Sequence, residues 1–241
     1  MQAIDSEHTF HRFDDELNEI AALVDNMGAI AVDQLRRAVK SLKKENPAKA
    51  HEVISRDRLL NDLDVEIDEK IIQLLAKRAP VAGDLRQIIT VGKVVTDLER
   101  TGDEARKIAG LCIHLHESDH QVPSDQILRD IFSMAKFVGT MLKESMDAFS
   151  RLDVELAFSV LRMDEELEEQ FDAMLRHLST FIMEDSRNVG HFVDIVLGIR
   201  ALERFGGHAK NIAGHVIFLA TANDVRHLDA DDIALLLDIE E

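Results

Sequence analysis

The chain has 241 residues, of which 46% are hydrophobic, and it carries a formal net charge of −18. This acidic excess argues against direct nucleic-acid binding, which depends on Lys and Arg neutralising phosphates, and against docking on anionic lipid by charge alone. The lack of Trp and Tyr, together with only 3 Pro, disfavours a strand-rich fold, so we expect an all-α protein.

The single cysteine and the N-terminal residues indicate the compartment. Cys112 has no partner for an internal disulfide, which is typical of a reducing environment. Residues 1–10 carry acids and lack the apolar region of a signal peptide, and no run of about 18 apolar residues is present to form a spanning helix. We therefore expect a cytoplasmic protein.

The first half of the chain shows three helical patterns. Apolar residues at helical spacing predict a first helix over about 9–44, which Asn46-Pro47 should end because the residue before proline leaves the α region. A second helix is predicted through 53–75. A third is predicted through 85–112, with Asp84 as the cap that accepts from its first free amides.

The second half repeats this plan after a short polar linker over 116–123, which is the best module boundary in the chain. Ser124 is the expected cap of the next helix. Three more helices are predicted through 127–146, 157–178 and 193–220, with a break at 185–190 before the last. We therefore divide the chain into a first module (1–118), a second module (119–222) and a polar C-terminal tail (223–241) with one short apolar run.

An internal repeat supports this division. Leu98-Glu99-Arg100 returns as Leu202-Glu203-Arg204, and neighbouring Gly, Ala and Ile positions match at the same offset of 104. The predicted fold is two tandem, pseudo-symmetric antiparallel three-helix bundles. The copies differ at one chemically important place, where Asp103 of the first corresponds to Gly207 of the second.

The first module contains a candidate metal site. Glu99 and Asp103 are four residues apart and share a helix face, with Gly102 between them. A glycine is unfavourable inside a helix, so we expect that something there needs room or a close backbone approach. Counting residues from the turn between antiparallel helices places this pair opposite residues 58–62 of the second helix. Oxygen-bearing side chains share a face there: Asp57, Asn61 and Asp64.

The same count in the second module places Glu203 opposite Gln170. The surrounding residues Asp164, Glu168 and Asp172 share a face. Oxygen ligands on facing helices favour hard cations such as Mg, Mn or Fe. The alternative is that these are solvated acids, since a chain with 46 acidic residues contains many pairs at this spacing.

Catalysis has no support in the sequence. The chain has no metalloprotease helix motif, phosphate-binding glycine loop or nucleophile elbow. His208 and His215, seven apart in the last helix, are expected to lie at the surface or the edge of the core. A metalloenzyme of the helical carboxylate type would need Glu-x-x-His pairs, and none lies near Glu99 or Glu203.

Several segments together resemble the PhoU family of phosphate-transport accessory regulators. They occur in the family's order over nearly the whole chain, at residues 78–86, 97–103, 183–187, 200–206 and 224–227. The resemblance implies two symmetric three-helix bundles with E(D)xxxD motifs that bind metal ions or iron or zinc clusters. The pairs that fit this motif are Glu99 with Asp103, Asp64 with Asp68, and Glu168 with Asp172. Glu203 matches the first position of the last motif, but Gly207 replaces its aspartate, which puts a full second site in doubt.

The resemblance also implies a non-enzymatic signalling role. The family reports phosphate status from the Pst ABC transporter, through its ATPase subunit, to the PhoR sensor kinase, and restrains the phosphate-starvation regulon. A homodimer that reaches the membrane only through protein partners is implied, with bound Fe, Zn, Mn or Mg. The alternative is a helical scaffold or a carboxylate-bundle metal protein without a role in phosphate signalling.

Overall fold

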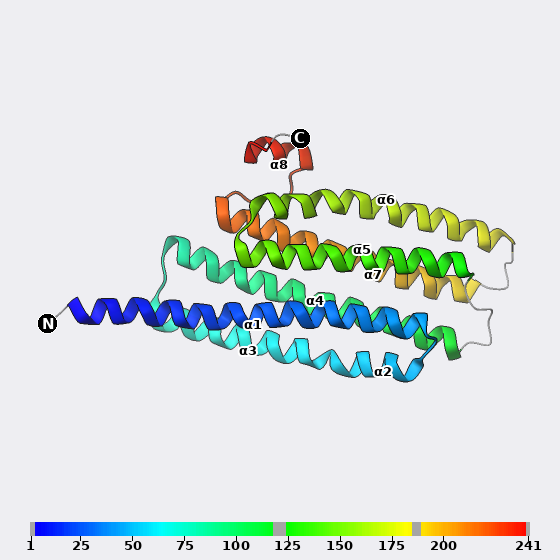
Figure 1. The fold of residues 1–241 in the computed structure, drawn as a ribbon, viewed down its shortest axis with the longest axis horizontal. Coiled ribbons are helices and arrows are strands. Elements are labelled where there is room, and N and C mark those ends of the chain that lie inside the picture. Colours follow the sequence, from blue (N-terminus) through cyan, green and yellow to red (C-terminus); the bar gives the residue numbers. More distant parts are fainter. Residues whose placement is uncertain (1–2, 118–123, 185–188, 240–241) are drawn as a thin grey trace.

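The computed structural model describes residues 3–117, 124–184 and 189–239, and in these ranges the chain forms eight helices and no strand (Figure 1). The helices are α1 (Ala3–Lys43), α2 (Pro47–Arg56), α3 (Arg58–Arg78), α4 (Ala82–Glu117), α5 (Asp125–Arg151), α6 (Val154–Glu184), α7 (Val189–Thr221) and α8 (Ala230–Leu237). The predicted all-α class is confirmed.

The predicted second helix is interrupted once. Asp57 separates α2 from α3, although its backbone stays right-handed at φ −53° and ψ −35°. The carbonyl of Asp57 accepts from the amide of Leu60, three residues on, at 3.0 Å and from the amide of Asn61 at 3.4 Å, so one tight turn precedes the regular i−4 pattern of α3. The apolar periodicity continues across this turn, which is why the sequence pattern alone predicted a single helix.

The helix ends follow capping chemistry, with one correction. The Asn46 side chain accepts from the amide of Lys49 at 3.1 Å, with Pro47 at the first helical position, and Ser124 caps α5 as predicted. The cap predicted at Asp84 is wrong, because α4 already begins at Ala82. Asp84 lies inside the first turn, where its charge favours the positive end of the helix dipole.

Parts of the predicted linkers lie outside the described residues. The linker over 116–123 overlaps α4, which continues through Glu117, and the boundary between 118 and 119 is not among the described residues. Residues 185–188 of the second predicted break are likewise outside them. Within the described part, α7 already begins at Val189.

The helices form two three-helix bundles side by side, as predicted (Figure 1). α1, the α2–α3 pair and α4 form one bundle, and α5, α6 and α7 form the other. α4 and α7 run antiparallel and pack on each other at the centre, while α1 contacts α5. The apolar residues of both bundles join in one continuous core, with Leu98 of α4 and Phe205 of α7 fully buried.

The tail forms the short helix α8, which packs on α6 through the buried Ile233. The Asp229 side chain caps this helix by accepting from the amide of Asp232 at 2.8 Å. Across the described ranges, no helix combines the length and apolar character needed to cross a membrane.

Candidate functional site

The carboxylates predicted for the first module gather between α3 and α4. Asp57 at the α2–α3 junction is buried, Asp64, Glu99 and Asp103 are partly buried, and Asn61 and Asp68 are exposed. Burial raises the pKa of Glu99, and the charges of Asp103, Asp64 and Asp57 raise it further. The residue count from the turn therefore predicted the correct facing segment.

The buried Asp57 is the centre of this acidic group. Burial raises the pKa of Asp57, the charge of Arg106 lowers it, and the charge of Asp103 raises it further. Arg106 lies on α4 with its Nε 3.4 Å from Asp57 Oδ2, and it also donates to Asp103 at 2.6 Å. The other oxygen of Asp57, Oδ1, is buried without a hydrogen-bond partner.

Gly102 permits the close approach of the two helices. A Cβ at this position would lie 2.3 Å from Leu60 Cδ1 and 3.0 Å from Asp57 Oδ1. Gly206 has the same role in the second module, because its Cβ would lie 2.2 Å from Leu167 Cδ2. The expectation that a glycine stands here for close packing is confirmed.

We expect Gly206→Ala and Gly207→Ala to change stability in opposite directions. At Gly206 a methyl group also meets Val138 at 3.2 Å, so overpacking outweighs the gain in helix propensity, with a net loss of about 1–2 kcal/mol. At Gly207 no described atom outside its own helix backbone lies within 4 Å of the Cβ position, so alanine should add about 0.5–1 kcal/mol. Urea unfolding followed by circular dichroism measures both, and equal effects would contradict the close-packing role.

The second module repeats this arrangement, with a lysine in place of Arg106 beside the buried aspartate. Asp164 is buried on α6, three residues before Leu167, as Asp57 stands three residues before Leu60. Lys210 of α7 lies 2.5 Å from Asp164 Oδ2 and occupies the repeat position of Arg106. Each module thus places a buried aspartate of its second helix against a cation of its third.

Glu203 is the other carboxylate of the second module. Burial raises its pKa, Arg200 lowers it, and the charges of Asp164 and Glu168 raise it. Its Oε2 is buried without a hydrogen-bond partner. Asp172, which was predicted to share the site, is exposed.

The chemistry of these residues suits a cation, but their arrangement is not a closed ligand set. Each module has a buried carboxylate oxygen without a hydrogen bond, Asp57 Oδ1 and Glu203 Oε2, which a bound cation would satisfy, although Arg200 Nε lies 3.4 Å from Glu203 Oε2. However, no three His, Cys, Asp or Glu side chains among the described residues are arranged to hold a metal ion. Cation binding in the first module therefore requires Arg106 to release Asp57 and Asp103.

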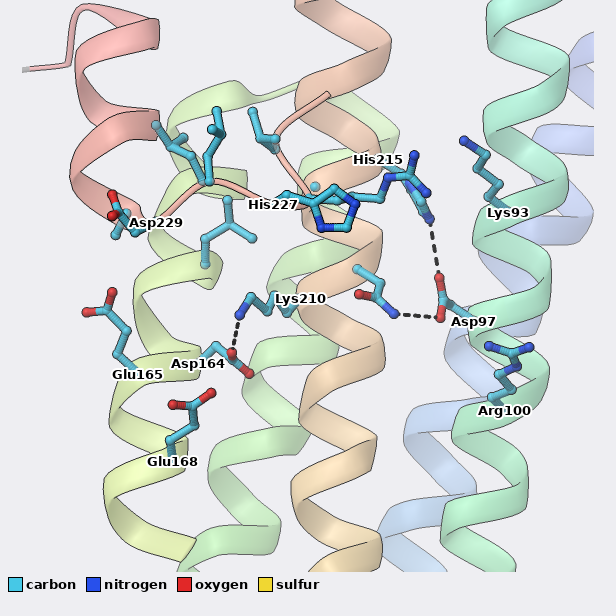
Figure 2. A pocket seen from close by; sticks show the side chains of 18 of the residues that line it. Lys93, Asp97, Arg100, Asp164, Glu165, Glu168, Lys210, His215, His227 and Asp229 are labelled. Atoms are coloured by element: carbon cyan, nitrogen blue, oxygen red, sulfur yellow. Dashed lines mark hydrogen bonds and ion pairs between the residues drawn. The ribbon is translucent and has the colours of Figure 1, made fainter. Parts of the chain in front are cut away.

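A second polar cluster lies between the modules, and the sequence interpretation missed it. Asp97 of α4 is only 6% exposed. It accepts from His208 Nδ1 at 2.9 Å. Asn211 Nδ2 donates to the same oxygen at 3.1 Å, and His215 Nε2 lies 3.3 Å from the other oxygen (Figure 2). Both histidines are buried, so the expectation that they lie at the surface or core edge is wrong.

Hydrogen bonding decides the charge of Asp97. Burial would raise the pKa of its carboxyl, but the hydrogen bonds from His208, His215 and Asn211 outweigh burial and lower it to about 2. The seven-residue spacing of the histidines was the available signal, because it places both on one face of a helix. The partner on α4 could not be identified from it, since the repeat offset relates Asp97 to Ala201, which carries no charge.

A pocket of about 660 Å³ opens beside this cluster (Figure 2). Lys93, Asp97 and Arg100 line it from α4, and Glu165 and Glu168 line it from α6 on the opposite side. Lys210 and His215 line it from α7, and the segment that leads into α8, including the buried Val225, lines it as well. The pocket therefore joins a mainly basic wall of one module to an acidic wall of the other.

Comparison with known families identifies the repeat. The family model described as the PhoU domain matches residues 24–111 and again residues 131–216, one range in each half of the chain. The two matches together cover most of the sequence. They correspond to the two bundles that the fold shows.

Individual relatives agree with this match over nearly their whole length. The chain is 38% identical over 221 residues to a phosphate-specific transport system accessory protein PhoU homolog of Pseudomonas aeruginosa, covering 92% of this chain and 90% of the relative. It is 31% identical over 232 residues to the accessory protein PhoU of Escherichia coli, covering 96% and 95%. The crystal structure of PhoU from Pseudomonas aeruginosa superposes with a TM-score of 0.82 at 36% identity, covering 88% of this chain and all of that one. That of the regulatory protein PhoU from Streptococcus pneumoniae gives 0.80 at 25% identity, covering 88% and 99%. The chain belongs to the PhoU family.

Proposed function

We propose that this protein is a non-enzymatic cytoplasmic regulator that couples the Pst phosphate transporter to a PhoR-type sensor kinase. In this role it restrains the phosphate-starvation regulon when phosphate is plentiful. The observation that carries the proposal is the family match in both halves, with relatives named as accessory proteins of phosphate-specific transport. The experiment that tests it is the loss of alkaline phosphatase repression in a strain that lacks the gene.

The proposed partners are the ATPase subunit of the transporter, the kinase and a second copy of this chain. Membrane association then arises through these proteins. The net charge of −18 supports partners that present basic surfaces, because complementary charge speeds association and favours the correct pairing. Direct contact with nucleic acid is not part of the proposal, for the same electrostatic reason.

We also propose that the carboxylates of the first module bind a metal ion, and that the second module binds one less well. Glu99, Asp103, Asp57 and Asp64 would hold the ion, and its role there is structural and electrostatic. Support comes from the mutual charge effects on the pKa of Glu99 and from the unpaired Asp57 Oδ1. In the second module Lys210 already neutralises Asp164, and Gly207 supplies no carboxylate.

Replacing Glu99 with Gln and Asp103 with Asn together is expected to remove most of the metal bound by protein purified without chelator. The amides keep the size of the side chains and remove the charge that a hard cation requires. Elemental analysis and titration with Mn²⁺ measure the loss. The matched control is Glu165→Gln with Glu169→Gln, an exposed pair at the same spacing on α6.

Gly207→Asp extends this test to the second module. Among the described residues nothing outside the helix's own backbone lies within 4 Å of the Gly207 Cβ position, so aspartate fits there and should add metal binding beside Glu203. Unchanged metal content in the Glu99/Asp103 double variant would contradict the site and favour the scaffold alternative.

A further inference from the structure

The groove between α4 and α7 has two related ends, which differ in what covers them. At one end Val225 of the tail lies over Gly214, with its Cγ2 3.9 Å from the Cβ position of that glycine. The repeat offset of 104 relates Gly214 to Gly110 at the other end. No described atom lies within 4 Å of the Cβ position at Gly110.

This open end is a hollow of about 380 Å³, which we name the distal groove. Gly110, Leu111 and Leu197 form its apolar floor, and its charged lining consists of Lys107, Arg200 and Arg204 with the carboxylates of Glu104 and Asp194. Leu197 is 61% exposed, whereas Val225 and Ile233 of the tail are both buried at the covered end. The same helix pair thus has an apolar cover at one end and exposes an apolar floor at the other.

The lining of the distal groove has three cations against two carboxylates, so it is positive by one charge within a strongly acidic protein. Lys107 and Arg204 both reach the buried Glu104, at 2.9 Å and 3.2 Å, and Arg200 lies 3.4 Å from Glu203. One carboxylate therefore anchors two of the three cations beside the floor. An occupant that combines apolar and acidic side chains matches this surface.

The outer face of α8 has that combination. Leu235 is 84% exposed, the largest value among the exposed large apolar side chains of the described residues, and Leu236 is 43% exposed. Asp231 and Asp232 in the first turn are exposed, and the helix has no basic residue in its last turn. Leu235 lies three and four residues from these aspartates, so leucine and carboxylates share one helix face.

We propose that α8 of a second copy docks in the distal groove, with Leu235 on the apolar floor and Asp231 and Asp232 toward Lys107, Arg200 and Arg204. The contact is reciprocal, so each copy places its α8 in the distal groove of the other copy across a two-fold axis. It rests on the homodimer proposed above and assigns its interface. Each α8 stays attached to α6 of its own chain through Ile233.

Sedimentation equilibrium and light scattering of the full chain test the contact. Leu235→Asp removes the apolar side chain of the tail, and Leu197→Asp places a charge on the floor of the groove. Each is expected to weaken dimerisation by about tenfold or more, because each replaces an apolar side chain of the contact by a carboxylate that loses its water on the apolar floor. The control Ile72→Asp, at a 64% exposed position on α3, should leave the dimer unchanged.

Mixing the two variants gives the most specific result. A mixed dimer pairs the intact groove of the Leu235→Asp chain with the intact tail of the Leu197→Asp chain, so it keeps one of the two contacts. The fraction of dimer in the mixture should therefore exceed that of either variant alone at the same total concentration. A monomer at all concentrations, or a dimer that neither variant weakens, would overturn the proposal. A Leu197→Asp chain that loses stability but dimerises normally would show that the protein's own segment fills the groove. None of these results bears on phosphate-dependent repression, which has its own test.

Discussion

Replacing Asp97 with alanine is expected to lower the free energy of unfolding by about 3 kcal/mol or more. The substitution leaves the buried donors of His208 and His215 without their acceptor, whereas the exposed Asn211 can donate to water instead. Losing one partner of a buried polar network costs more than the network contributes, because the remaining groups stay desolvated. Urea denaturation followed by circular dichroism measures the difference from the wild type.

The position in the second module that corresponds to Asp97 provides a comparison for this prediction. Ala201 occupies the corresponding position on α7, so alanine itself is compatible with a helix in this central pair. Glu169→Ala, an exposed carboxylate on α6, is the control and should change stability by less than about 0.5 kcal/mol. A loss of similar size in both variants would show that the Asp97 cluster contributes nothing particular to the joining of the modules.

The contribution of Asp97 should also depend on pH. Its pKa in the folded protein is about 2, below the ordinary value of 3.8. A lowered pKa means that the stabilisation is complete above about pH 4 and is lost as the pH falls toward 2. The difference between the wild type and Asp97→Ala is therefore expected to shrink by about 2 kcal/mol over this range. A difference that stays constant from pH 5 to pH 2 would contradict the ionised network.

The features that repeat within each module could be predicted from the sequence. Antiparallel neighbours joined by a short turn meet at equal distances from it, and this rule placed Glu99 opposite the segment that contains Asp57 and Asp64. The glycine between Glu99 and Asp103 indicated a close approach, which Leu60 makes. These inferences need only the geometry of two helices and one turn.

The contacts between modules could not be predicted in this way. Asp97 and His208 are 111 residues apart, and no turn length relates their helices. Their meeting depends on how far α4 and α7 slide along each other when the two bundles pack. The repeat also gave no signal, since Ala201 and Glu104 stand at the corresponding positions.

The interruption at Asp57 was missed for a local reason. The apolar positions keep helical spacing through Val53, Leu60 and Ile67, all of them buried, so the pattern has no gap there. The structure changes only the hydrogen-bond spacing at one turn, where the buried carboxylate meets Arg106. A periodicity argument cannot detect a change that keeps the same face inside.

The central claim is that this protein restrains the phosphate-starvation response, and its most direct test is alkaline phosphatase activity in high phosphate. A strain that lacks the gene should produce the enzyme at the level that the parent reaches only when starved, because the signal from transporter to kinase is missing. Restoring the gene in single copy should restore repression, and the starved parent serves as the upper reference. Normal repression in the deletion strain would contradict the proposed function.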